Sequence, residues 1–121
     1  MYEISFYEDE KGNSDVKDLI EKLRDKSKKD KDARINYHKI VAYIDLLEEY
    51  GTGIGEPVTK HLDGDIWELR PLSNRILFAY YDDNEYVLLH HFTKKTRKTP
   101  KREIEKAKRE IEDYKRRRNK L

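Results

Sequence analysis

Three apolar runs separated by short polar turns dominate residues 60–93, which read KHLDGDIWELRPLSNRILFAYYDDNEYVLLHHFT. We predict a β-strand in each run, because β-branched, aromatic and leucine side chains favour a half-buried pleated surface. The three predicted strands are 66–70, 75–81 and 86–93. The turns that join them are short and rich in Pro, Ser, Asn and Asp. Turns this short make neighbouring strands antiparallel, since a parallel return needs a much longer crossover.

Helical patterns lie on both sides of this predicted sheet. Ser14 is an expected N-cap, and the helix after it should fade in the polar run 25–31. A second helix should stop at Gly51 and form an antiparallel pair with the first. A short strand at 2–7 precedes this pair, and Thr99-Pro100 has N-cap and first-turn chemistry for a last helix that reaches residue 121. The order of elements predicts one α+β domain spanning 1–121.

Composition excludes several classes of protein. The chain has 121 residues, of which 43% are charged and 36% hydrophobic, and it has no cysteine. A disulfide framework, a thiolate nucleophile and a cysteine zinc site are therefore excluded. No apolar run approaches the roughly 20 residues that cross a bilayer, and no signal-peptide pattern opens the chain. We expect a cytoplasmic bacterial protein without membrane attachment.

The net charge of +2 hides an uneven distribution. Residues 1–93 carry 13 Lys/Arg and 20 Asp/Glu, a balance of −7, whereas 94–121 carry 14 and 5, a balance of +9. A basic end on an acidic body is typical of a surface that binds polyanions, although a solubilising tail has the same composition. We place this basic helical tail at 99–121 and expect its run 115–118 to be frayed, because it has no apolar anchor.

Three blocks of residues match a known superfamily in order and spacing. They are Lys60-x-Leu62-x-Gly64-x-Ile66-Trp67-Glu68-Leu69-Arg70, Arg75-Ile76-Leu77-Phe78 and Leu88-Leu89-His90-His91-Phe92-x-Lys94-Lys95-Thr96-x-Lys98-Thr99-Pro100. In these blocks the chain resembles the RelE/HigB superfamily of bacterial toxins, particularly its phage-derived HigB-like branch. The resemblance implies a small α+β domain in which the N-terminal strand and helical hairpin pack on a curved antiparallel sheet, followed by a C-terminal helix.

The same resemblance implies a function. Such toxins enter the ribosome and cut mRNA there, and an antitoxin silences them. The implied partners are therefore the ribosome, mRNA and a HigA-like helix-turn-helix antitoxin, through which alone the pair would bind operator DNA. Two alternatives remain open, a gyrase-poisoning toxin of the ParE kind and a non-catalytic RNA-binding domain. A convergent group of cations favours the nuclease, because a pure binder does not need one.

RNA can be cleaved without a metal when a 2′-hydroxyl attacks the adjacent phosphate, which needs a base, an acid and fixed cations. The resemblance places Arg75 at the position that stabilises the transition state, Arg70 at a second basic position and Lys95 at a basic catalytic position. Glu68 is either a base or a group that holds the arginines. His61 is a further acid–base candidate, because its unperturbed pKa lies near physiological pH. We expect no cofactor and no metal site.

Candidate RNA-binding residues surround these positions. They are Lys60, Thr93, Lys94, Lys98 and His91. Lysines contact phosphates, which positions RNA without reading its sequence. Adjacent strand residues point to opposite faces, so one histidine of the pair at 90–91 should share the face of Thr93 while the other is buried and hydrogen-bonded.

Overall fold

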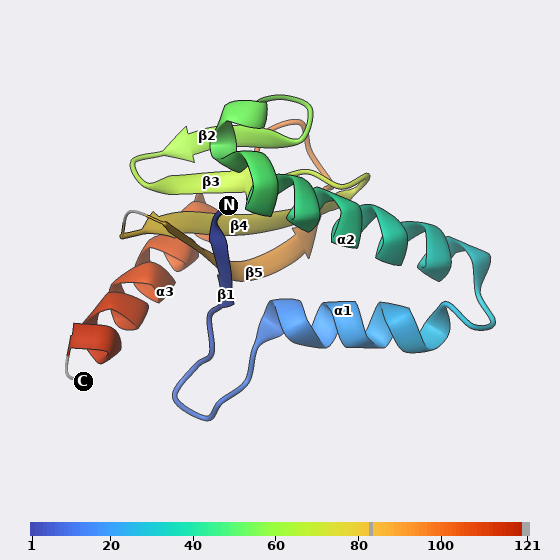
Figure 1. Cartoon of the computed structure of the whole chain (residues 1–121), viewed down its shortest axis with the longest axis horizontal. Helices are drawn as coiled ribbons and strands as arrows, with labels where there is room; N and C mark the ends of the chain where they lie inside the picture. Colours follow the sequence, from blue (N-terminus) through green and yellow to red (C-terminus); the bar gives the residue numbers. More distant parts are fainter. Residues whose placement is uncertain (83, 120–121) are drawn as a thin grey trace.

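The computed structural model of the chain describes residues 1–82 and 84–119. The elements in order are β1 (Glu3–Phe6), α1 (Asp15–Lys26), α2 (Lys31–Tyr50), the 3-10 helix η1 (Gly51–Ile54), β2 (Thr59–Asp63), β3 (Ile66–Leu69), β4 (Asn74–Tyr81), β5 (Glu85–Thr93) and α3 (Lys101–Asn119). The expected α+β fold is confirmed, with one sheet and helices on both of its faces (Figure 1). Asp83 of a predicted turn and Lys120 and Leu121 of the predicted last helix lie outside the described residues.

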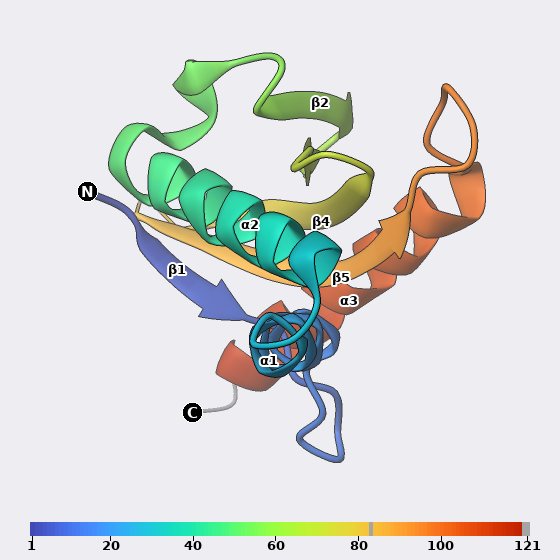
Figure 2. The same ribbon diagram turned by 90° about the vertical axis from the view of Figure 1, so that its right-hand side faces the viewer.

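The five-stranded sheet has the order β1-β5-β4-β3-β2 and curves around α2 (Figure 2). Strands β2 to β5 pair antiparallel, as the short turns between them predict. Strand β1, however, runs parallel to β5, with Glu3 opposite Glu85 and Phe6 opposite Leu88. The sequence predicts antiparallel pairing only for the strands that short turns join, and β1 pairs parallel because the long stretch of chain between β1 and β5 provides the crossover that parallel pairing needs.

Strand β2 forms the other edge of the sheet and was not predicted. Its sequence, TKHLD, lacks an apolar alternation, and a register irregularity lies between His61 and Asp63. Charged side chains and irregular pairing are common at sheet edges, where they discourage pairing with other chains. Lys60, the first residue of the three matched sequence blocks, lies in this strand and pairs with Glu68 of β3.

Capping side chains and a glycine define the α1–α2 hairpin. Ser14 accepts a hydrogen bond from the Lys17 amide at 3.3 Å, which confirms it as the N-cap of α1. Helix α1 ends at Lys26, within the polar run where it was expected to fade. Helix α2 stops before Gly51 as predicted, and Gly51 is its C-cap, with φ 68°. A Cβ at position 51 would lie 2.7 Å from the ring of Tyr2, so a side chain there is excluded on steric grounds as well.

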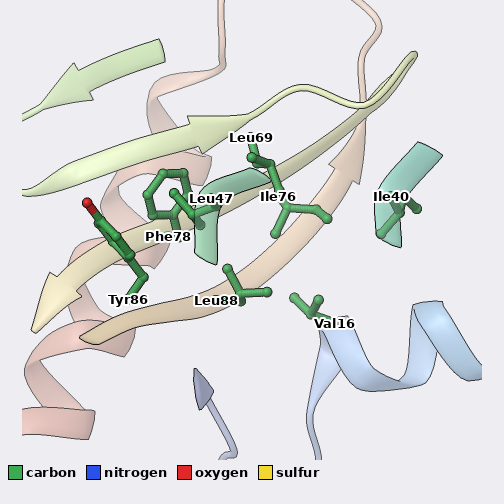
Figure 3. Close-up of a cluster of buried hydrophobic side chains, with 8 residues drawn as sticks. All are labelled: Val16, Ile40, Leu47, Leu69, Ile76, Phe78, Tyr86 and Leu88. Atoms are coloured by element: carbon green, nitrogen blue, oxygen red, sulfur yellow. The ribbon is translucent and has the colours of Figure 1, made fainter. Parts of the chain in front are cut away.

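Alternation along β4 divides the interior into two layers. Ile76 and Phe78 face α1 and α2, where they pack with other fully buried side chains (Figure 3). Leu77 and Ala79 face α3 and contact a second cluster that contains Ala107 and Ile111. No helix within residues 1–82 and 84–119 combines the length and hydropathy that a membrane span requires.

A register shift in β5 changes which face its later residues occupy. Leu77 pairs with His90 and Phe78 pairs with Leu88, so Leu89 has no opposite residue on β4. Such a bulge places two consecutive side chains on nearly the same side of a strand. As a result Leu89 and His90 both lie toward α3, while His91 lies toward α1.

Candidate active site

A cleft of about 300 Å³ opens on the α3 side of the sheet. It lies between β2, the ends of β3 and β4, and the loop 94–100 that joins β5 to α3. Figure 2 shows this loop, in orange, projecting beyond the end of β5. The side chains that line the cleft are Lys60, His61, Leu62, Glu68, Arg70, Arg75, Phe92, Lys94, Thr96, Arg97, Lys98, Thr99 and Ile104.

Arg75 is the buried cation of this cleft. It is 6% exposed, and it lies opposite Phe92 near the start of β4. Its Nη1 donates to the carbonyl oxygens of Leu72 at 2.7 Å and Asn74 at 2.9 Å. Burial lowers the pKa of Arg75, Glu68 opposes this effect, and repulsion by Arg70 adds to it. An arginine keeps its charge under such a shift, so the cleft contains a fixed cation that two carbonyls hold in place.

Glu68 is the buried carboxylate of the cleft and lies within β3. It is 2% exposed, and its Oε1 accepts a hydrogen bond from the Thr99 hydroxyl. Its Oε2 lies 3.6 Å from Nε of Arg70, while Nη1 of the same arginine donates to Glu56 at 3.2 Å. Glu68 therefore contacts Thr99 and an arginine at once, which fits the expectation that it holds a basic residue in place.

Thr99 differs in role from the sequence-based expectation. It was expected to cap the last helix, but α3 begins at Lys101, and the carbonyl of Pro100 accepts from the Glu103 amide at 3.0 Å. Pro100 thus occupies the capping position, and the hydroxyl of Thr99 points instead to Glu68. The reason is that a buried carboxylate needs a donor more than a solvated helix end does.

Lys60 and His61 reach the cleft from β2. Lys60 is exposed, and the structure describes no ion pair for it. Nε2 of His61 lies 2.7 Å from the carbonyl oxygen of Gly64, and the imidazole lies 5.0 Å from the Trp67 ring. Since a carbonyl oxygen only accepts, Nε2 donates, and the neutral ring then has an unprotonated Nδ1 that can accept a proton.

The loop after β5 supplies the remaining cations. Lys94 and Lys98, two of the predicted RNA-binding residues, line the cleft together with Arg97. Arg97 was not singled out from the sequence, although it stands in the same basic run. Lys95 and Thr93 are exposed and lie outside the lining of the cleft.

His91 lies away from the cleft, against the first turn of α1. Its backbone amide donates to Oδ2 of Asp15 at 2.7 Å, and its Nδ1 lies 2.5 Å from the same oxygen. Burial alone would raise the pKa of Asp15, but the hydrogen bonds and charge of His91 outweigh it and lower the pKa. The structure thus gives His91 a structural contact and does not place it in the cleft with Lys60, Lys94 and Lys98.

The basic end of α3 is ordered and paired, so the expectation of fraying at 115–118 is wrong. Arg117 donates to the carbonyl of Glu8 and to Oδ2 of Asp113 at 2.7 Å. Arg118 donates to the Tyr114 hydroxyl at 2.5 Å and lies 3.5 Å from Oε2 of Glu85. Anchoring by polar contacts and aromatic rings replaces the apolar anchor that the sequence lacks.

The electrostatics of the cleft follow from these positions. Six of its side chains are basic and one, Glu68, is acidic. Within residues 1–82 and 84–119, neither Lys60 nor the three cations of the loop has an acidic partner within ion-pair distance. Such a concentration of unpaired cations around a fixed arginine attracts a polyanion and can bind phosphate oxygens. No group of three His, Asp or Glu side chains in the described part of the chain is arranged to hold a metal ion.

Fold and cleft together define a small α+β protein whose curved sheet carries a cationic site. The phage-derived Gp49-like protein family (DUF891) matches residues 18–112, and the chain belongs to this family. The family is part of the RelE/HigB-like toxin superfamily and is associated with the toxins of toxin–antitoxin systems. Membership implies an antitoxin partner. A search among curated proteins finds no match to the chain.

Proposed function

We propose that this protein is a HigB-like toxin that cleaves mRNA on the ribosome, using the 2′-hydroxyl as nucleophile rather than a metal-activated water. The observation that carries the proposal is the cleft itself, in which six basic side chains surround one buried carboxylate. A surface that only binds a protein partner does not need its cations to converge on a concave site. RNA cleavage does, because negative charge builds up on the phosphate in the transition state.

Arg75 stabilises that charge in the proposed mechanism. Its Nη1 is occupied by the carbonyls of Leu72 and Asn74, which leaves the other nitrogens of the guanidinium for phosphate oxygens. Because these contacts exist before RNA binds, no reorganisation is needed at the moment of reaction. Preorganisation of this kind is the main source of electrostatic catalysis.

His61 is the proposed base, because its hydrogen bond to Gly64 leaves Nδ1 free to accept the proton of the 2′-hydroxyl. As the 2′-oxygen bonds to phosphorus, the bond between phosphorus and the 5′-oxygen breaks. The 5′-oxygen takes a proton from water and leaves as a 5′-hydroxyl, and a 2′,3′-cyclic phosphate remains on the other fragment. Lys60, Lys94 and Lys98 bind phosphates on either side of the reacting bond. Lys95 is exposed beside this group and approaches the RNA from outside the cleft.

A HigA-like helix-turn-helix protein is the proposed antitoxin, and operator DNA would be bound only by the complex of the two. Co-expression with the adjacent open reading frame tests this part. A stable complex that binds DNA, together with a free toxin that does not, is the expected result. Growth that is unaffected when the toxin is expressed alone would contradict the toxin assignment.

Primer extension on mRNA translated in vitro by purified ribosomes tests the cleavage. We expect cuts within translated codons, and we expect Arg75→Ala to slow them by about 10²–10³-fold, as loss of one preorganised contact does in other enzymes. Arg109→Ala is the matched control, since Arg109 is exposed on α3 and lies outside the cleft.

Two other results would redirect the assignment. DNA breaks that depend on gyrase, with intact transcripts, would indicate the ParE-like alternative. RNA binding with equal affinity in the wild type and Arg75→Ala, and no cuts in either, would indicate a non-catalytic RNA-binding domain.

A further inference from the structure

The basic loop 94–100 is attached to the sheet at both of its ends. At its start, the amide of Lys94 donates to the carbonyl of Ser73, in the turn between β3 and β4, at 2.8 Å. At its end, the Thr99 hydroxyl donates to Oε1 of Glu68 on β3, 31 residues earlier in the chain. The second attachment is made by side chains alone, so its strength depends on the identity of two residues.

The bond between Thr99 and Glu68 lies in an environment that makes it strong. Glu68 is 2% exposed, and a carboxylate removed from water requires donors. Oε2 of Glu68 lies 3.6 Å from Nε of Arg70, which is longer than a hydrogen bond, and this nitrogen has no hydrogen-bond partner among the described residues. The Thr99 hydroxyl is thus the closest donor that the structure describes for this carboxylate.

Little else restrains the middle of the loop. The hydroxyl of Thr96 donates to the carbonyl of Lys98 at 2.7 Å, but this bond lies within the loop and does not tie it to the sheet. The cations at 94, 97 and 98 make no ion pair within residues 1–82 and 84–119. The position of these cations over the cleft therefore depends on the two attachments at the loop ends.

We propose that the hydrogen bond from Thr99 to Glu68 is a latch that holds the basic loop 94–100 over the cleft, which makes Thr99 and Glu68 positioning residues for the phosphate-binding cations. This inference rests on the proposed function for its consequence in RNA binding, whereas the latch itself is a property of the fold. It also assigns Glu68 a role other than general base, since the carboxylate is buried and already bound by Thr99.

Loss of the latch should affect RNA binding more than the rate of the cleavage step. When the latch is absent, the cations of the loop must be ordered as the RNA binds, and the conformational entropy of that ordering weakens binding. Arg75 keeps its own anchors at Leu72 and Asn74 and is not affected directly. Loss of the latch should therefore raise KM and leave kcat nearly unchanged.

Thr99→Val removes the hydroxyl and keeps the shape of the side chain, and Thr99→Ser keeps the hydroxyl. Because Thr99→Val loses one hydrogen bond to a charged group, we expect it to weaken binding of a short single-stranded RNA by about tenfold. KM for mRNA cleavage should rise by the same factor. Hydrogen exchange of the amides at 94–99 should become faster. Thr99→Ser should restore all three. Thr52→Val, a valine substitution remote from the cleft, is the matched control.

Glu68→Gln separates the latch from a role in proton transfer. The amide oxygen of glutamine still accepts from Thr99, so cleavage should persist with a kcat within about tenfold of wild type. A loss of about 10³-fold or more in kcat would show that Glu68 is the base and would overturn its assignment as a positioning residue.

The outcomes for the latch and for the nuclease are distinguishable. Unchanged loop exchange and unchanged RNA affinity in Thr99→Val overturn the latch even when the wild type cleaves mRNA. A wild type that does not cleave mRNA overturns the proposed function, and the exchange rates of Thr99→Val against Thr99→Ser still decide the latch.

Discussion

His90→Leu is expected to be among the most destabilising single substitutions in the α3 half of the interior. His90 is 1% exposed beneath α3, where Nδ1 lies 2.5 Å from Glu110 Oε1 and Nε2 lies 3.0 Å from Glu103 Oε1. Each ring nitrogen therefore lies within hydrogen-bond distance of a different carboxylate of α3. One side chain of β5 thereby fastens two turns of α3 to the sheet. Leucine cannot replace either bond.

The expected loss of stability in His90→Leu comes from two lost hydrogen bonds and from two carboxylates that are left without a donor. A hydrogen bond to a charged group contributes about 1.5–3 kcal/mol, so two together contribute about 3–6 kcal/mol. The side chains of Glu103 and Glu110 are 19% and 13% exposed, which lets water recover part of this loss. We therefore expect the free energy of unfolding to fall by about 3 kcal/mol. For a chain of this size that corresponds to a Tm lower by about 12 °C.

Urea titration and thermal unfolding followed by circular dichroism measure this change. His38→Leu is the matched control, because His38 is exposed on α2, and it should leave Tm nearly unchanged. Replacing His90 together with Glu103 and Glu110 by leucine should recover most of the loss, since no buried carboxylate is then left without a donor. A loss below about 1 kcal/mol in His90→Leu, or no recovery in the triple variant, would refute this account of how α3 is held.

Three further results are expected. Tyr7→Phe should abolish a tyrosine titration near pH 12, because burial and the hydrogen bond to Asp113 raise the pKa of Tyr7 to about 12. The stability that this raised pKa provides is present below pH 10 and is lost as the pH rises through 12. A spectrophotometric titration of the wild type and of Tyr7→Phe checks this prediction. Arg118→Ala should lower Tm relative to Arg109→Ala in thermal melts, because Arg118 pairs with the buried Glu85; equal melting temperatures would contradict the described contacts. Lys98→Ala should reduce the slope of log K against log salt for RNA binding by about one, and an unchanged slope in the salt series would remove Lys98 from the phosphate contacts.

The local elements of this fold could be predicted because their causes are local. Ser14 satisfies amides one turn away, Gly51 adopts a conformation that closes α2, and the short turns of 66–93 make their strands antiparallel. The concentration of basic residues after Thr93 is equally visible in the sequence, and in the structure three of these residues line one wall of the cleft.

The sequence-based predictions are wrong for segments whose structure depends on contacts with residues far away in the chain. The strand β2 lacks a periodic pattern, and it exists because β3 offers it an unpaired edge. The end of α3 was expected to fray because no apolar residue anchors it, yet Arg117 and Arg118 find acceptors on the N-terminal segment and on β5. Such contacts join residues far apart in the chain, and no local propensity encodes them.

The sequence by itself therefore determined the class of fold, the antiparallel core of the sheet and the presence of a cationic surface. Tertiary structure decided that β1 pairs parallel with β5, that a bulge sends His90 toward α3, and that Thr99 bonds to Glu68 instead of capping a helix. The physical reason is the same in each case. Unpaired strand edges and buried charges must find partners, and which partner lies within reach is fixed only when the whole chain is packed.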